Sequence, residues 1–294
     1  MHPVRIGNDH VGPGCPTYVI GELGINHNGS MDMAKAMIDV AAKVGCDAVK
    51  FQKRTVEIVY SKEELSRPRN SPFGTTNGDL KRGLEFDVRQ YAELGRYAIS
   101  KGLAWGASVW DAIACGELGV KCTTRPNFLK IASPTLTDDD VLKACATLKM
   151  IDKIPVILST GMSTLEEINH AISILGKDRL ILMHCISAYP PEDRDLNVNT
   201  VLGLEAEFGL PVGYSGHELH NEASLLAAAL GACCIERHFT LSRHLWGSDQ
   251  KVSIEPTEMA NLVNRLGMYN LMMGSFDSTC YSCEEKAKSK LRKA

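Results

Sequence analysis

Residues 156–187 read VILSTGMSTLEEINHAISILGKDRLILMHCIS, in which two apolar runs of strand length flank a segment with helical character. Ser163 or Thr164 can cap the start of this helix, and Glu166 or Glu167 supports its first turn. Gly176 stands where the helix should stop. The stretch therefore predicts a strand, a helix and a second, parallel strand.

The same alternation recurs along the chain. Apolar runs of strand length occupy residues 18–25, 46–52, 103–110, 128–133, 156–162, 180–187, 211–217 and 233–239. Segments of helical character separate them, such as residues 30–45, where apolar residues recur three and four apart. Eight such units favour a parallel (β/α)8 TIM barrel, although a doubly wound open sheet alternates in the same way.

Polar residues decide between these two α/β folds, because they gather at the carboxyl end of each predicted strand. An open sheet concentrates such residues at one switch point, whereas a barrel collects them from all eight strands on one rim. All eight runs contribute here, with Glu22, Asn26 and His27; Lys50 and Gln52; Ser108 and Asp111; Lys130 and Ser133; Ser159 and Thr160; His184, Ser187 and Tyr189; Ser215 and His217; Glu236 and His238. The sequence therefore predicts a barrel with its active site at this rim.

Composition narrows the function classes. The 294 residues are 44% hydrophobic and 23% charged, with a formal net charge of −3, which is typical of a globular enzyme and gives no basic footprint for nucleic acid. No apolar run reaches the roughly 20 residues of a membrane span, and the N-terminus lacks a signal-peptide pattern, so we expect a cytoplasmic protein. We expect a barrel domain over residues 1–274 and a charged tail over residues 275–294. Cys280 and Cys283 form a single Cys-x-x-Cys in this tail, and without a second such pair we favour a tail with no metal over a structural zinc site.

Residues 53–86 are too long and polar for a simple connection after the second strand. Loops of this length in compact domains are usually lids or binding loops, and the alternative is a disordered insertion. We expect this segment to help choose the substrate, together with Arg237, Arg243, Trp246 and Asp249 around the last strand.

Two histidines indicate a metal site. His217 ends the seventh strand and His238 lies in the eighth, so their imidazoles can converge, with Glu236 one pleat further in. Neutral imidazoles with open positions suit a divalent ion. His184 on the sixth strand is a weaker third candidate.

Two lysines indicate an anion site. Lys50 and Lys130 emerge within apolar runs, where an isolated ammonium is costly to bury. Hydroxyls at four other strand ends (Ser108, Ser133, Ser159 and Ser215) can donate to phosphate oxygens. The alternative is that the lysines pair internally with Glu22 or Glu236. A metal, a phosphate site and spare carboxylates together suggest condensation of a phosphorylated small molecule with a carbonyl compound.

Seven motifs carry a resemblance: GELGINHNGS (21–30), AVKFQ (48–52), LKIAS (129–133), ILSTGM (157–162), HCISAYP (184–190), GYSGH (213–217) and IERHFTL (235–241), the last followed by GSDQKVSIEP (247–256). In this order the chain resembles the N-acetylneuraminate (sialic acid) synthase family over roughly residues 17–256. The resemblance implies a phosphoenolpyruvate-binding barrel that condenses phosphoenolpyruvate with an aldose such as N-acetylmannosamine, gives a 3-deoxy-2-keto acid and phosphate, and uses Mn²⁺ or Mg²⁺. Barrels of this type are often homodimers or other homo-oligomers.

Residue by residue, the resemblance makes His217 and His238 the metal ligands. It assigns phosphoenolpyruvate to Lys50, Ser108, Lys130, Ser133, Ser159 and Ser215. It makes Glu22 the essential acid of the first strand and puts Gln52, Tyr189, Glu236 and Asp249 on the sugar side. Glu22 or Asp249 would orient the attacking water or move its proton, and the resemblance does not decide between them.

The chain departs from the family pattern at three points. Ala188 replaces a usual Asn that contacts phosphoenolpyruvate, Thr135 stands near a usual acidic residue, and no C-terminal antifreeze-like domain follows the barrel motifs. These departures leave the acceptor sugar open. Another phosphoenolpyruvate–aldose synthase, a catalytically retired sugar-binding barrel and an aldolase using free pyruvate are the alternatives.

Overall fold

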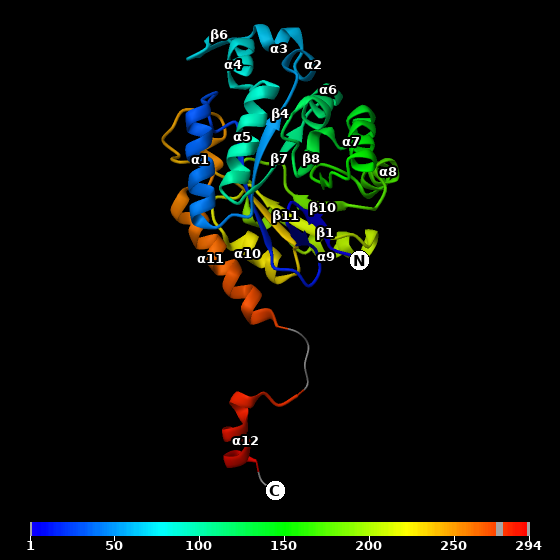
Figure 1. The fold of residues 1–294 in the computed structure, drawn as a ribbon, viewed down its shortest axis with the longest axis vertical. Helices are drawn as coiled ribbons and strands as arrows, with labels where there is room; N and C mark the ends of the chain where they lie inside the picture. Colours follow the sequence, from blue (N-terminus) through cyan, green and yellow to red (C-terminus); the bar gives the residue numbers. More distant parts are fainter. Residues whose placement is uncertain (1, 275–278, 293–294) are drawn as a thin grey trace.

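The computed structural model describes residues 2–274 and 279–292. Eight parallel strands close into a barrel, which confirms the predicted fold (Figure 1). In chain order they are β3 (Tyr18–Gly24), β4 (Ala48–Lys53), β7 (Ala104–Val109), β8 (Phe128–Ile131), β9 (Val156–Ser159), β10 (Leu180–Cys185), β11 (Val212–Gly216) and β12 (Cys234–His238). Strand β12 pairs with β3 and so closes the barrel.

Helices surround the barrel (Figure 1). They are α1 (Met31–Val44), α5 (Val88–Ser100), α6 (Ala112–Gly116), α7 (Asp139–Ile151), α8 (Leu165–Leu175), α9 (Thr200–Phe208), α10 (Glu222–Ala229) and α11 (Pro256–Met273). The predicted start of α8 is confirmed, because Thr164 and Glu167 form a reciprocal capping box. Gly45 and Gly176, at the ends of α1 and α8, have φ of 88° and 69°, a region that favours glycine.

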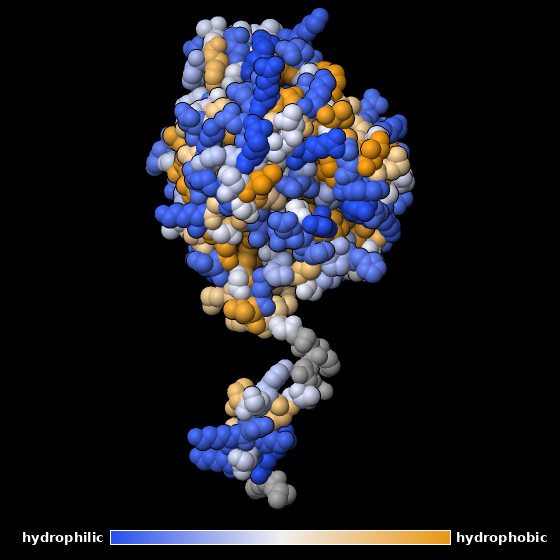
Figure 2. Space-filling view, in the orientation of Figure 1, coloured by the Kyte–Doolittle hydropathy of each residue, from blue (hydrophilic) through white to orange (hydrophobic). Residues whose placement is uncertain are grey.

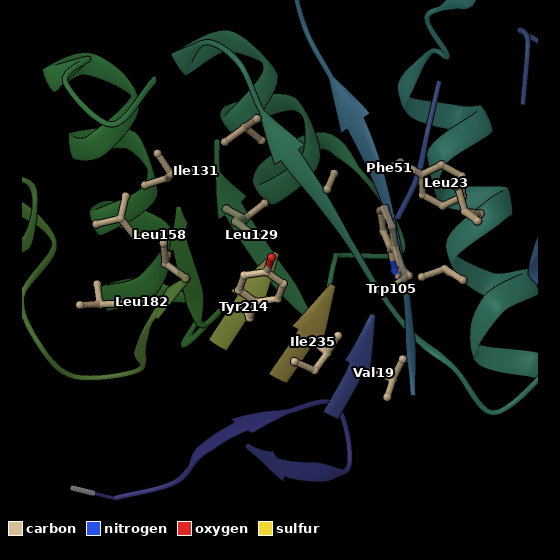
Figure 3. Close-up of a cluster of buried hydrophobic side chains, with 14 of the residues drawn as sticks. Val19, Leu23, Phe51, Trp105, Leu129, Ile131, Leu158, Leu182, Tyr214 and Ile235 are labelled. Carbon is tan, nitrogen blue, oxygen red and sulfur yellow. The ribbon is translucent and has the colours of Figure 1, made fainter. Parts of the chain in front are cut away.

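Strand alternation sorts side chains into two layers. Side chains such as Leu129, Ile131 and Leu158 belong to the large cluster under the helices, and Figure 3 shows them on adjacent strands. Their neighbours in sequence turn into the barrel, where Phe128 and Ile157 belong to a separate apolar cluster. The barrel interior is therefore apolar at its amino-terminal end, which leaves the polar residues for the carboxyl end.

A short antiparallel hairpin, β1 (Val4–Ile6) and β2 (Asp9–Val11), precedes the barrel and was not predicted. Its buried side chains Val4, Ile6 and Val11 belong to the interior cluster that also holds Phe128 and Ile157. The hairpin therefore packs with the amino-terminal layer of the barrel interior.

The segment 53–86 is folded. It contains α2 (Val56–Val59), α3 (Lys62–Ser66), the hairpin β5 (Pro68–Ser71) and β6 (Gly74–Thr76), and α4 (Asn77–Leu84). Capping boxes at Ser61 and Thr76 begin α3 and α4. The alternative of a disordered insertion is therefore wrong.

The predicted tail contains α12 (Glu285–Leu291), which Figure 1 shows apart from the barrel and Figure 2 shows as largely hydrophilic. All side chains from 279 to 292 are exposed, including the free Cys280 and Cys283. Residues 275–278 and 293–294 of the predicted tail lie outside the described residues. None of the described helices combines the length and the apolar composition needed to cross a membrane.

Candidate active site

A cavity of about 400 Å³ opens at the carboxyl ends of the barrel strands. The side chains that the resemblance assigned to the metal, to phosphoenolpyruvate and to the sugar side all line it: Glu22, Lys50, Gln52, Ser108, Lys130, Ser133, Ser159, Tyr189, Ser215, His217, Glu236, His238 and Asp249. The structure therefore brings this set together, from seven of the barrel strands and from the loops that follow β8, β10, β11 and β12.

Strand register explains how the closest neighbours meet. Glu22 lies opposite Lys50 on one side and His238 on the other, and Ser215 lies opposite Glu236. Residues in register on parallel strands point to the same face of a sheet. The barrel register therefore places carboxylates beside ammonium groups and hydroxyls.

The two lysines are buried and paired with carboxylates. Lys50 forms an ion pair with Glu22 and donates to Ser108 Oγ at 2.7 Å. Lys130 Nζ lies 2.6 Å from Glu236 Oε1. Internal pairing, the alternative that the sequence left open, is therefore present.

Pairing does not exhaust the donors of Lys130. An ammonium group has three N–H donors, and the other close contact of Lys130 Nζ is Met183 Sδ at 3.2 Å, a weak acceptor. Glu236 also accepts from Ser215 Oγ at 3.1 Å. Burial would raise the pKa of Glu236, but Lys130 and Lys50 hold it below its usual range, so the carboxylate is ionised at neutral pH. Lys130, which lines the cavity, thus keeps donor capacity that its partners do not use.

A glycine keeps several hydroxyl and thiol groups close together on one wall. A Cβ at Gly161 would lie 2.6 Å from Ser187 Oγ and 2.8 Å from Ser133 Oγ. Ser133 Oγ in turn lies 3.1 Å from Cys185 Sγ. This wall therefore presents small donors, and Ser187 and Cys185 join the predicted serines in lining the cavity.

Two imidazoles face each other at the rim. The ring centres of His217 and His238 are 5.5 Å apart, and the Tyr189 ring lies 4.3 Å from that of His217. His217 Nδ1 is 2.9 Å from Ile186 O and so donates to it, which leaves Nε2 as the acceptor. Burial, with His238 adding to it, lowers the pKa of His217 to about 3, so the ring is neutral.

A chain of polar contacts leads from the first strand toward the segment 53–86. Gln52 Nε2 donates to Glu22 Oε1 at 3.0 Å, and Arg54 donates to Gln52 Oε1. The Arg54 guanidinium also pairs with Glu85 at 3.1 Å and lies 4.9 Å from the ring centre of Trp110. Arg54 and Trp110 line the cavity, and sequence reasoning missed both.

Helix α4 adds Lys81 to the cavity, and Tyr60, which follows the end of α2, also lines it. Two glycines leave room for Phe73, because a Cβ at Gly29 or Gly83 would collide with its ring. The segment 53–86 therefore contributes side chains to the cavity wall, and its part in choosing the substrate stays a prediction.

Asp249 is positioned by the buried loop that follows β12. Asn26 Nδ2 donates to Phe239 O and to Ser253 Oγ, both at 2.8 Å. Ser253 Oγ donates to Asp249 O at 2.6 Å. The first and last strands thus hold this loop and its carboxylate over the cavity.

Some candidates do not reach the cavity. His184, the weaker metal candidate, turns out of the barrel, and its Nε2 lies 2.8 Å from Leu196 O. Thr135 is buried and donates to Ala132 O at 3.1 Å. Ala188 is exposed and does not line the cavity, although Ser187 and Tyr189 on either side of it do. The structure therefore removes His184 from the metal candidates.

Arg237 and Arg243 are likewise wrong as substrate residues. Arg237 faces away from the cavity and pairs with Glu218 at 3.1 Å, both side chains being 1% exposed. Arg243 pairs with Glu258 at 2.8 Å. Of the residues expected to help choose the substrate around the last strand, Asp249 lines this cavity and Trp246 lines an adjoining one.

The buried pair gives a stability prediction. Replacing Arg237 with Met leaves the Glu218 carboxylate buried without its cation, so we expect the free energy of unfolding to fall by about 3–5 kcal/mol. Arg194→Met is the matched control, because Arg194 pairs with Glu192 at the surface and its loss should cost less than about 1 kcal/mol. Urea unfolding measures both, and equal losses would contradict a structural role for the buried pair.

The donor set for a metal is limited to two protein side chains. Within residues 2–274 and 279–292, no group of three or more His, Cys, Asp or Glu side chains could hold an ion. His217 and His238 therefore fit an ion that takes its remaining ligands from water or substrate. His238 Nδ1 is buried without a hydrogen-bond partner, so the fixed nitrogen of this pair is that of His217.

The sequence of this chain is similar to those of two known synthases. An N-acetylneuraminate-9-phosphate synthase of Homo sapiens is 35% identical over 292 residues, which are 97% of this chain and 79% of that protein. An N,N'-diacetyllegionaminic acid synthase of Legionella pneumophila is 34% identical over 277 residues, 90% of this chain and 75% of that protein.

A solved structure has the same architecture. The crystal structure of N-acetylneuraminic acid (sialic acid) synthetase from Leptospira borgpetersenii, in complex with citrate, superposes with a TM-score of 0.85 at 29% identity. It covers 100% of this chain and 99% of that one. The model of the NeuB family matches residues 37–278. Because this match spans most of the chain and the two relatives are 35% and 34% identical to it, the protein belongs to the NeuB family.

Proposed function

We propose that the chain condenses phosphoenolpyruvate with an aldose to give a 3-deoxy-2-ulosonic acid and inorganic phosphate, with a divalent ion at His217 and His238. One observation carries the proposal: two buried ammonium groups, several hydroxyls and two facing imidazoles line a single cavity at the carboxyl end of a barrel. The names of the related human and Legionella proteins, which are synthases of sialic-acid-type sugars, support this type of reaction.

Phosphoenolpyruvate binds through its phosphate and carboxylate. Lys50 and Lys130 supply two positive charges, and Ser108, Ser133, Ser159 and Ser215 supply hydroxyl donors around the same cavity. The thioether beside Lys130 Nζ is a weaker acceptor than a phosphate oxygen, so an anion gains a charged hydrogen bond there. Ion pairs with Glu22 and Glu236 keep the two lysines in place.

The residues at the rim suit a divalent ion. His217 would bind it through Nε2, with Nδ1 fixed by Ile186 O, and His238 would supply the second nitrogen. When bound, such an ion draws electron density from the aldehyde oxygen of the acceptor. The Tyr189 ring lies beside that of His217, tilted by 46°, and would hold the acceptor against the pair.

The reaction joins two carbons and breaks one C–O bond. C3 of phosphoenolpyruvate attacks the aldehyde carbon, whose oxygen takes a proton, and water adds to the resulting cationic C2 and loses a proton. The C2 hydroxyl then passes its proton to the phosphate as the bond between C2 and the phosphate oxygen breaks, which releases hydrogen phosphate and leaves a ketone. Glu22 or Asp249, which both line the cavity, would take the proton from the water.

Phosphate release tests the proposal. Purified protein with phosphoenolpyruvate and Mn²⁺ is screened against N-acetylmannosamine, its 6-phosphate, mannose, arabinose 5-phosphate and diacetamido-hexoses. We expect release with a specific acceptor, loss of release with chelator, and a product whose mass equals the acceptor plus the three-carbon keto acid unit. Phosphoenolpyruvate that neither binds nor reacts would contradict the proposal and favour a retired barrel.

A further inference from the structure

Arg54 is a buried cation that the proposed chemistry does not use. It follows β4, is 4% exposed and lines the cavity. Lys50 and Gln52 reach the cavity from β4, and Arg54 continues the same alternation beyond the end of the strand. A charged side chain that is buried in this way needs polar partners.

Four contacts fix this guanidinium. Its Nε lies 3.1 Å from Glu85 Oε1, and its Nη1 donates to Tyr60 Oη at 3.0 Å. The guanidinium carbon lies 4.9 Å from the ring centre of Trp110, within the range of a cation–π contact. The remaining nitrogen, Nη2, donates to Gln52 Oε1. One side chain thus ties the segment 53–86, which supplies Glu85 and Tyr60, to a residue of the cavity wall.

Arg54 decides how the Gln52 amide is turned. A guanidinium can only donate, so the amide oxygen of Gln52 must face it. The amide nitrogen then faces Glu22, and Nε2 donates to Oε1 of that carboxylate at 3.0 Å. The backbone is held as well, because Tyr91 Oη donates to Gln52 O at 2.6 Å. Residues of the chain itself therefore fix both ends of this amide before any ligand binds.

The amide nitrogen lies near the facing imidazoles. A Cβ at Gly24 would lie 3.2 Å from both Gln52 Nε2 and Glu22 Oε1. The same point lies 3.7 Å from His238 Cε1, so the three groups surround it. An amide nitrogen carries two N–H donors, and among the residues that the structure describes only Glu22 accepts from this one. The second N–H is therefore left for an oxygen atom of a ligand held at the imidazoles.

Charge balance does not explain the contact between Arg54 and Gln52. Glu85 has a second cation, because Lys53 Nζ lies 4.0 Å from Glu85 Oε2. Lys53 also pairs with Glu117 at 3.4 Å, and it does not line the cavity. The two neighbouring cations share one carboxylate, and of the two only Arg54 adds a contact to the cavity wall.

We propose that Arg54 is a positioning residue for the acceptor sugar, because it turns the Gln52 amide so that the free N–H donates to an oxygen atom of the aldose. The inference rests on the proposed function, which places the aldehyde at His217 and His238. Loss of the Arg54 contact should therefore affect the aldose far more than phosphoenolpyruvate.

Arg54→Lys tests the inference without removing the charge. Lysine keeps a cation beside Glu85 but cannot also reach Gln52 and Tyr60, because its ammonium is a single point charge. We expect kcat/KM for the aldose to fall by about 10-fold through a higher KM, the size of one hydrogen bond, and the KM for phosphoenolpyruvate to change by less than about twofold. Burial raises the pKa of Glu85 to about 7 against the opposing charges of Arg54 and Lys53, so rates are measured at about pH 8, where this carboxylate is mostly ionised.

A double-mutant cycle tests whether Arg54 acts through Gln52. Arg54→Lys should lower kcat/KM for the aldose in the otherwise unmodified protein and cause no further loss in a Gln52→Ala background. Lys53→Met is the matched control, because it removes the other cation beside Glu85 and should cost stability without changing the KM for the aldose. Thermal unfolding of every variant checks the fold. Additive losses in the cycle, or an equal rise of the KM in Lys53→Met, would overturn the positioning role.

A binding measurement separates this inference from the proposed function. N-acetylmannosamine is titrated by calorimetry into the protein with Mn²⁺ and without phosphoenolpyruvate. Binding that weakens by about 10-fold in Arg54→Lys, with no phosphate release from any aldose, would overturn the proposed function and support the positioning role. Phosphate release with an unchanged aldose KM in Arg54→Lys would support the proposed function and overturn the positioning role. Neither binding nor release would overturn both.

Discussion

Replacing Lys130 with Met lowers kcat/KM for phosphoenolpyruvate by about 10²- to 10³-fold, as expected when one preorganised charged donor is removed from an active site. The KM for phosphoenolpyruvate should rise far more than the KM for the aldose, because Lys130 is one of the two lysines that line the cavity and that we propose bind the phosphate. Initial rates measured over both substrates give the two constants. An equal effect on both would contradict a dedicated phosphate site.

The ion pair between Lys130 and Glu236 means that Lys130→Met changes stability as well as substrate binding, and a double variant separates the two effects. Removing Lys130 leaves the buried Glu236 carboxylate with only the more distant Lys50, at 3.8 Å, as its cation. The loss of the close partner is expected to destabilise the fold whatever its effect on the substrate. The double variant Lys130→Met/Glu236→Gln removes both charges, so it should recover stability without recovering phosphoenolpyruvate affinity. Lys149→Met is a matched control, since Lys149 is buried elsewhere and donates to Gly176 O at 2.7 Å. It should lower stability and leave the KM for phosphoenolpyruvate unchanged.

Strand alternation explains which site residues could be predicted from sequence. Lys50, Lys130 and Glu236 stand at interior positions of their strands, and in-register pairing puts them beside their neighbours in the cavity. The same rule excludes His184 and Arg237. Met183 contacts Lys130 and Cys185 lines the cavity, so His184 between them must face outward. A polar residue near a strand end therefore belongs to the rim only if strand alternation also turns its side chain inward.

Residues outside the strands were harder to predict. Lys81 and Tyr60 reach the cavity because the segment 53–86 packs through Phe73 against Gly29 of the first strand's loop, a contact that no sequence periodicity indicates. The N-terminal hairpin has strands of three residues, too short for a pattern. Where packing between distant segments decides the position of a side chain, sequence spacing gives no signal.

The internal pairing of the lysines could not be decided from sequence either. A buried lysine needs a negative partner, and that partner can belong to the protein or to the ligand. The structure gives each lysine a glutamate and still leaves Lys130 beside a thioether. Both hypotheses describe the same site, because the carboxylates hold the ammonium groups where an incoming anion can share them.

Replacing His238 with Ala should abolish turnover and weaken Mn²⁺ binding by more than about 100-fold, since even changes to the partners of metal ligands cost 10- to 100-fold. The fold should survive, because His238 ends its strand at the cavity and its Nδ1 has no hydrogen-bond partner to lose. Calorimetry with Mn²⁺ measures the affinity directly, and thermal unfolding checks the fold.

His184→Ala is the matched control for this variant. His184 is also a buried histidine near a strand end, but its ring faces out of the barrel toward Leu196 O. Its loss should cost stability and leave Mn²⁺ affinity unchanged. Unchanged Mn²⁺ affinity in His238→Ala, or equal losses in both variants, would remove the imidazole pair as the metal site. A loss confined to His238→Ala would place the ion beside Tyr189 and His217, where the aldehyde of the acceptor must then lie.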